Sequence, residues 1–167
     1  MARRVFFSFH YERDIWRANV VRNSWVTQER EAAGFFDASL WEEAKKKGDE
    51  SIKRMIDRGL DNSSVTVVLI GAETADRKYV LYEIEQSYKR GNGLLGIHIN
   101  NIENRDGLAD YQGANPFDKL QLERNGRICL LSALVKVYDW RLNYGYQNFA
   151  GWVEEAAKAA GQQGRLT

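Results

Sequence analysis

The chain is poor in cysteine, proline and histidine. Its 167 residues include one cysteine, Cys129, one proline, Pro116, and two histidines, His10 and His98. A lone cysteine excludes an internal disulfide framework and is typical of proteins in a reducing compartment. Neither the histidines nor Cys129 have the spacing of zinc ligands, so we expect no metal site.

The sequence also lacks an excess of charge and a long apolar run. Lysine and arginine number 24 and aspartate and glutamate 23, for a formal net charge of +1. This balance gives no electrostatic reason to expect a nucleic-acid or membrane partner. No apolar run approaches the roughly 20 residues that cross a bilayer, and no signal peptide precedes the first strand-like run. We therefore expect one cytoplasmic domain over residues 1–167.

The chain does contain a regular alternation of strand-like and helix-like segments, arranged around Val65–Ile70. This run is apolar on both faces, as is typical of a central parallel strand covered by helices on either side. The other predicted strands are 5–9, 34–37, 93–99 and one within 128–140, and the predicted helices are 14–30, 49–58, 79–88 and 149–160. The alternation predicts an α/β, flavodoxin-like fold with about five mostly parallel strands and helices on both faces.

Several local features refine this prediction. Asp14 is a candidate N-cap of the first helix. The candidate core contacts of this first helix are Ile15, Trp16, Val20, Trp25 and Val26. Residues 38–43 are expected to form a loop, and residues 100–127 an irregular insertion or mobile flap.

Four glycines are expected to end or connect elements. Gly59 and Gly161 are predicted to end helices, Gly91 to cap a third helix and Gly93 to form a turn. Residues 91–96 match the pattern G-x-G-x-x-G, but here a helix ends and a strand begins. A dinucleotide fingerprint needs the opposite order, so we reject that site.

A phosphoryl-accepting receiver domain would share the predicted topology. It needs clustered acidic residues near the end of the first strand to hold a metal. This chain has Ser8, Phe9, His10 and Tyr11 there instead, which excludes that class. His10 follows the strand end directly, where it could either contact a ligand or simply face solvent.

Two carboxylates on the 79–88 helix are candidates for chemistry. Glu83 and Glu85 lie on opposite flanks of the apolar stripe, because successive residues turn by roughly 100°. Tyr79 shares the flank of Glu83 and could form an aromatic wall beside it. Periodicity alone does not choose between the two glutamates.

Five stretches together resemble the bacterial TIR-like family, and within it the TIR-like sensor subunit of the Thoeris anti-phage system. They are RVFFSFHY at 4–11, FDASLWE at 36–42, VVLIG at 67–71, YVLYEI at 79–84 and VYDW at 137–140. The resemblance extends from about residue 3 to residue 153.

The resemblance implies an NAD-cleaving enzyme that releases nicotinamide and makes a cyclic ADP-ribose isomer. Glu83 occupies the place of the family's catalytic glutamate, and Tyr79 stands where relatives commonly have a tryptophan. The resemblance also implies substrate contacts at Ser8, Phe9, His10, Asp37, Trp41 and Tyr79.

The family's properties further imply the partners. NAD is a substrate, no metal is needed, and the cyclic product reaches an effector protein by diffusion. A phage-derived trigger switches on an otherwise inactive enzyme, and a homo-oligomer could form. Two alternatives stay open: a non-catalytic TIR-like interaction module, and a nucleoside deoxyribosyltransferase-like enzyme with a glutamate nucleophile.

Overall fold

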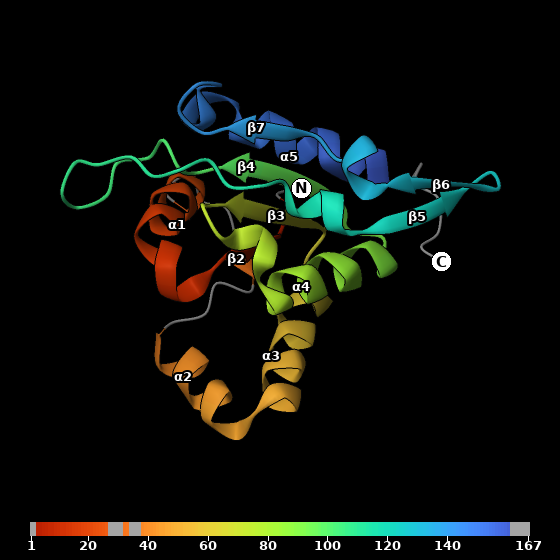
Figure 1. The fold of residues 1–167 in the computed structure, drawn as a ribbon, viewed down its shortest axis with the longest axis horizontal. Helices are drawn as coiled ribbons and strands as arrows, with labels where there is room; N and C mark the ends of the chain where they lie inside the picture. The colour runs from red at the N-terminus through yellow and green to blue at the C-terminus, as the bar shows by residue number, and fades with distance from the viewer. Residues whose placement is uncertain (1–2, 27–31, 34–37, 161–167) are drawn as a thin grey trace.

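A five-stranded parallel sheet forms the centre of the molecule (Figure 1). The computed structural model describes residues 3–26, 32–33 and 38–160. The strands are β1 (Val5–Ser8), β2 (Ala32–Ala33), β3 (Val65–Ile70), β4 (Gly93–His98) and β7 (Val137–Asp139). Their order is β2-β1-β3-β4-β7, and all four neighbouring pairs are parallel. This is the flavodoxin-like order, so the predicted fold class is confirmed.

Helices cover both faces of this sheet (Figure 1). α1 (Tyr11–Val26) and α5 (Gly145–Ala160) pack on one face, where they share a core with β1, β3 and β4. α4 (Lys78–Lys89) packs on the other face. α2 (Ala38–Lys47) and α3 (Asp49–Asp61) form a helical pair beside α4. No helix in the described ranges is long and apolar enough to cross a membrane.

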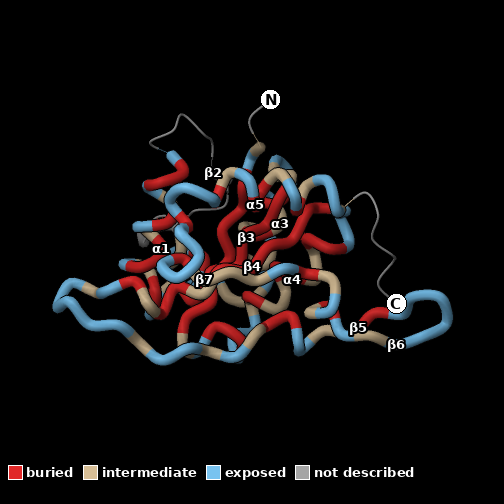
Figure 2. Tube along the Cα trace, turned by 90° about the horizontal axis from the view of Figure 1, so that it is seen from above, coloured by how far each residue is buried: buried red, intermediate tan, exposed pale blue. Residues whose placement is uncertain are grey.

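A small antiparallel hairpin lies apart from the main sheet. It consists of β5 (Gln121–Arg124) and β6 (Arg127–Leu130). Its turn residues Asn125 and Gly126 both have positive φ, as a two-residue hairpin turn requires. The hairpin projects from the body of the molecule, with an exposed tip (Figure 2). Three short 3-10 helices complete the described chain: η1 (Thr74–Asp76), η2 (Pro116–Lys119) and η3 (Leu131–Ala133).

Strand alternation decides which side chains of β1 reach which face. Val5 and Phe7 belong to the core under α1 and α5, whereas Phe6 packs with α3 on the opposite face. Successive residues of a strand point to opposite faces, so Ser8 lies on the same face as Phe6. A buried hydroxyl therefore lies at the carboxyl end of β1, on the side that α4 covers.

The inner face of α1 differs from the prediction. The helix begins at Tyr11, so Asp14 is not its N-cap but a buried helical residue with 1% exposure. Trp16, Val20 and Val26 are exposed, which makes these three predicted core contacts wrong, whereas Trp25 is buried as predicted.

The predicted core contacts of α1 are exposed because two charged residues, Asp14 and Arg17, occupy the buried side of the helix. Burial raises the pKa of Asp14 to about 6. Arg17 is buried because its guanidinium donates to the carbonyls of Ile102 (2.7 Å) and Leu108 (3.0 Å). A hydrophobic pattern cannot reveal a face that is completed by such distant contacts.

Other boundaries also shifted. Residues 38–43, expected as a loop, belong to the start of α2. Gly59 lies inside α3, which ends at Asp61 with Asn62 as its C-cap. The predicted strand 34–37 and the predicted helix-ending Gly161 lie outside the described residues. Segment 100–127 contains η2 and β5. Its first part, 100–115, has no helix or strand and folds back on itself, since the Asp110 N–H donates to the Asn100 carbonyl at 2.8 Å.

Gly93 is the first residue of β4 rather than a turn residue. A Cβ atom placed there would lie 2.6 Å from the carbonyl oxygen of Ala156 in α5. The backbone of α5 therefore packs directly on the start of β4. Only glycine permits this approach without displacing the helix.

Gly93→Ala should lower the free energy of unfolding by about 1–3 kcal/mol, because a methyl group would be forced against helix backbone. Gly151→Ala is the matched control: a Cβ at this α5 position meets nothing within 4 Å. It should raise the free energy of unfolding by about 0.5–1 kcal/mol through helix propensity. Urea denaturation followed by tryptophan fluorescence measures both. An unchanged free energy of unfolding in Gly93→Ala would contradict the close packing of α5 on β4.

Candidate active site

A narrow cavity lies between the carboxyl end of β1 and the first turns of α4. It is lined by Phe9, His10, Tyr11, Glu12, Trp41, Arg77, Tyr79, Val80 and Glu83. Its volume is about 20 Å³, which is room for one water molecule. A larger ligand can therefore enter only if the walls move apart.

Glu83 is the buried acid of this cavity. Its side chain is only 6% exposed, on the face of α4 that packs against the sheet. No cation in the described part of the chain forms an ion pair with it. Burial raises the pKa of the Glu83 carboxyl well above its ordinary value of 4.5. The neighbouring Ser8 hydroxyl opposes this rise in pKa, although it forms no hydrogen bond of ordinary geometry with any described residue.

Glu85, the competing carboxylate, has a different environment. It lies outside the cavity and its Oε1 accepts a hydrogen bond from Lys89 Nζ at 2.7 Å. This is an ordinary surface pair one helical turn apart. The orientation of α4 thus directs Glu83 into the cavity and Glu85 away from it.

Aromatic rings form a continuous wall of the cavity. The Tyr11 and Trp41 rings stack with centroids 5.4 Å apart, and Trp41 meets Tyr79 edge to face at 6.2 Å. The Tyr79 hydroxyl donates to Asp49 Oδ1 at 2.6 Å, and this hydrogen bond raises the pKa of Tyr79. Because Asp49 begins α3 and Trp41 belongs to α2, this wall is attached to the α2–α3 helical pair.

His10 lines the opposite side and is buried rather than solvent-exposed. Its Nε2 atom lies 3.9 Å from Glu73 Oε2. The pKa of His10 lies below its ordinary value of 6.5, mainly because the ring is buried and secondly because the charge of Arg77 acts on it. The imidazole is therefore neutral at neutral pH.

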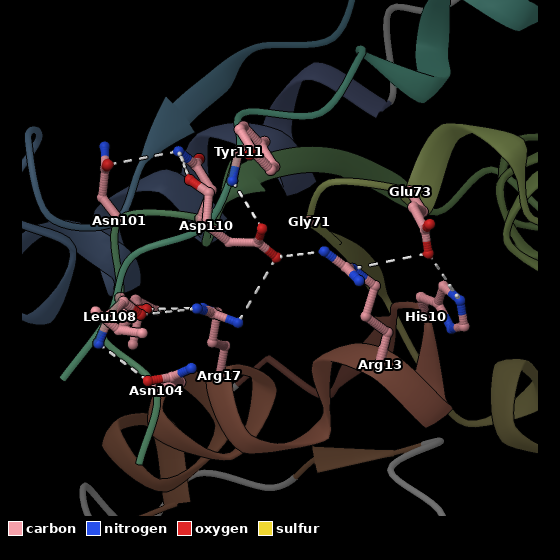
Figure 3. Close-up of polar contacts among 12 residues, drawn as sticks. His10, Arg13, Arg17, Gly71, Glu73, Asn101, Asn104, Leu108, Asp110 and Tyr111 are labelled. Carbon is pink, nitrogen blue, oxygen red and sulfur yellow. Dashed lines mark hydrogen bonds and ion pairs between the residues drawn. The ribbon is translucent and has the colours of Figure 1, made fainter. Parts of the chain in front are cut away.

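A polar network connects this side of the cavity to segment 100–115 (Figure 3). Arg13 Nε lies 3.7 Å from the Glu73 carboxylate that also faces His10. Arg13 Nη2 donates to Asp110 Oδ2 at 2.7 Å. Together with the Arg17 hydrogen bonds, these contacts hold the extended segment over the carboxyl edge of the sheet.

The structure brings most of the predicted site residues together. Phe9, His10, Trp41, Tyr79 and Glu83 line one cavity, and Ser8 lies next to Glu83. Asp37 lies outside the described residues. The sequence analysis missed Tyr11, Glu12, Arg77 and Val80 as lining residues. Their only sequence signal is position, directly after a strand end or at the start of the helix that carries Glu83.

Within the described ranges, no group of three or more histidine, cysteine, aspartate or glutamate side chains is arranged to hold a metal ion. The side chains of the cavity can instead supply a buried carboxyl, a neutral imidazole, an exposed guanidinium and stacking surfaces. Such a set suits a ligand with a flat ring and a centre that becomes positively charged during reaction.

The free energy of unfolding of Glu83→Gln should exceed that of the wild type by an amount that grows as pH rises. Above pH 4.5 the unfolded chain releases the Glu83 proton, whereas the folded protein retains it because burial raises its pKa. The wild type therefore loses up to about 1.4 kcal/mol of unfolding free energy per pH unit until the folded pKa is passed. Glutamine does not titrate, so the variant escapes this loss.

Thermal denaturation of both proteins, from below pH 4.5 to above neutrality, measures this difference. Asp14 also titrates from a raised pKa, but it is present in both proteins and cancels in the comparison. Glu85→Gln is the control, because it removes a partly exposed carboxyl from the same helix. A Tm difference that stays constant with pH would contradict the burial of an ionisable Glu83.

Comparison with known proteins identifies the family. The family described as "Thoeris protein ThsB, TIR-like domain" matches residues 6–104, which include every residue that lines the cavity. The chain is also similar to "Putative cyclic ADP-D-ribose synthase ThsB1" of Bacillus cereus (strain MSX-D12). The two are 42% identical over an alignment 191 positions long, which covers 92% of this chain and 100% of that protein. The chain therefore belongs to the Thoeris ThsB TIR-like family.

Proposed function

We propose that this protein is an NAD-cleaving TIR-like enzyme of anti-phage defence, which releases nicotinamide and converts the ADP-ribose part into a cyclic isomer. The observation that carries the proposal is Glu83, a buried carboxyl in an aromatic-walled cavity at the carboxyl end of β1. The similar protein of Bacillus cereus has the name "Putative cyclic ADP-D-ribose synthase ThsB1", which supports the same reaction for this protein.

The first step breaks the bond between the nicotinamide nitrogen and ribose C1′. The bonding electron pair leaves with nicotinamide, which becomes neutral, and positive charge develops on the ribose. An ionised Glu83 beside the ribose would stabilise this charge, as carboxylates do at sugars that become cationic. Tyr79 and Trp41 offer flat surfaces for the departing ring.

The charge of the substrate resolves an apparent conflict at Glu83. Burial raises the pKa of this carboxyl, which favours the neutral acid. The nicotinamide ring of NAD carries a positive charge, and a nearby positive charge lowers a carboxyl pKa. Binding of NAD would therefore ionise Glu83 at the moment when the carboxylate is needed.

The second step forms a new bond to ribose C1′ from a group in the adenosine half of the same molecule. Water competes for this position, so the site must exclude water while the adenosine end folds back. The rings of Phe9, Tyr11, Trp41 and Tyr79 are suitable walls for that purpose.

The narrow cavity supports an enzyme that is inactive until it is triggered. NAD is far larger than one water molecule, so the walls must move apart before it binds, and binding is weak until the open form is favoured. A phage-derived component or assembly into a homo-oligomer would move these walls. We propose that the protein acts in the cytoplasm as a single domain without a metal, and that its cyclic product diffuses to an effector protein.

Glu83→Gln should lower nicotinamide release by at least about 10²-fold, because the carboxylate that stabilises the ribosyl cation is lost. Glu85→Gln is the matched control on the same helix and should retain wild-type activity. Chromatography with mass detection measures nicotinamide and cyclic product. Both purified protein and phage-infected cells expressing each variant are assayed, so that a need for a trigger does not hide activity.

Equal nicotinamide release by wild type and Glu83→Gln would refute the proposed site. Defence that persists in Glu83→Gln, with association to another protein, would instead indicate a non-catalytic TIR-like module. Base exchange on deoxynucleosides through a trapped adduct on Glu83 would indicate a deoxyribosyltransferase-like enzyme.

Substitutions of Tyr79 separate its ring from its hydroxyl. Tyr79→Phe keeps the wall and removes only the hydrogen bond to Asp49, so kcat/KM should fall less than about tenfold. Tyr79→Ala also removes the ring, and we expect a loss of 10²-fold or more, about the effect of misplacing substrate. Similar losses in both variants would show that the hydroxyl, rather than the ring, is what the site requires.

A further inference from the structure

Arg77 differs from the other cations around the cavity. It is exposed at the N-cap of α4 and lines the cavity that contains Glu83. In the part of the chain that the structure describes, no ion pair or side-chain hydrogen bond engages its guanidinium. The neighbouring cations are all paired: Arg13 with Glu73 and Asp110, Lys45 with Glu12, and Lys78 with Asp49.

None of the described acidic groups near Arg77 forms a contact ion pair with it. Glu12 and Glu73 have partners of their own. Burial raises the pKa of Glu83 well above its ordinary value, which makes that acid a poor counter-ion for Arg77. The charge of Arg77 also acts on His10, whose pKa it helps to lower. The mouth of the cavity therefore carries a guanidinium with no contact ion pair among the described residues, although its charge acts on Glu12 at longer range.

The start of α4 adds to this charge. Its N-cap residue makes no side-chain capping hydrogen bond. The N-cap side chain therefore satisfies none of the backbone N–H groups of the first turn, and the helix dipole is positive at this end. An anion bound beside Arg77 would meet both the guanidinium and the helix terminus.

Helix geometry relates Arg77 to Glu83. The two residues are six positions apart, which corresponds to about 9 Å along the helix axis. If ribose C1′ lies at Glu83, a group attached at C5′ on the far side of that sugar comes within reach of the long Arg77 side chain. In NAD that group is the diphosphate.

We infer that Arg77 binds the diphosphate of the substrate and so selects dinucleotides over nucleosides at this site. The inference rests on the proposed function, because that function puts the ribose at Glu83. A guanidinium is suited to the task, since its fork of N–H donors matches two phosphate oxygens at once.

Calorimetric titration of the full-length protein tests this role. Glu83→Gln serves as the parent, so that bound ligand is not consumed, and the probes are ADP-ribose and nicotinamide riboside. Adding Arg77→Gln should weaken ADP-ribose binding at least about tenfold, the scale of a lost charge-assisted contact. Nicotinamide riboside, which has no phosphate, should bind as it does to the parent. Arg77→Lys should retain part of the ADP-ribose affinity.

Arg54→Gln in the same parent is the matched control. Arg54 is an exposed arginine on α3 outside this cavity, so its loss changes the net charge equally. It should leave the affinity for both ligands unchanged. Added salt should weaken ADP-ribose binding to the parent more than to Arg77→Gln, because screening acts on the charge that the variant lacks.

The inference is overturned if Arg77→Gln weakens both ligands equally, if Arg54→Gln matches its effect, or if the parent binds no ADP-ribose. Undiminished nicotinamide release from NAD by Arg77→Gln alone would also overturn it and would leave the proposed function intact. Arg77-dependent binding of ADP-ribose, with no nicotinamide release by wild type in either purified protein or phage-infected cells, would contradict only the proposed reaction.

Discussion

The structure depends on holding one carboxyl group, that of Glu83, out of water without a counter-ion among the described residues. Such a group is unfavourable in a protein interior and stays neutral unless a positive charge approaches. The rigid parts around it make this possible: β1 ends at Ser8, and α4 is fixed to the sheet through buried Val80 and Ile84. The burial of this carboxyl raises its pKa, and a positive charge placed beside it would lower that pKa again.

The elements nearest to Glu83 were predictable from sequence because their signals are local. Val65–Ile70 is apolar on both faces and is indeed the central strand, fully buried along its length. The periodicity of residues 79–88 matches α4 within a residue at each end. The choice between Glu83 and Glu85 was different, because both glutamates border the same stripe. Only the tertiary packing of α4 shows which one is buried.

Elsewhere, distant contacts decided the outcome. Asp14 was predicted as an N-cap and Arg17 carried no signal in the sequence. Both are buried, because Arg17 contacts segment 100–115 and Asp14 lies against Gly71, which follows β3. Gly93 read as a turn because its helix partner, Ala156, is far along the chain. No local pattern reports such encounters. Arg77 was missed for a related reason, since an isolated arginine before a helix has no distinctive spacing.

The attachment of Tyr79 to Asp49 has a consequence for how the cavity can open. Trp41 and Asp49 belong to two helices that share a small core with Phe6. Trp41 packs in that core and Tyr79 is hydrogen-bonded to Asp49, so the rings of Trp41 and Tyr79 cannot move away independently. Widening the cavity requires the helical pair to shift as a body. Such collective displacements occur over microseconds to milliseconds, far more slowly than the nanosecond flips of a free side chain. The rate at which a ligand enters this site is therefore set by how fast the helical pair moves.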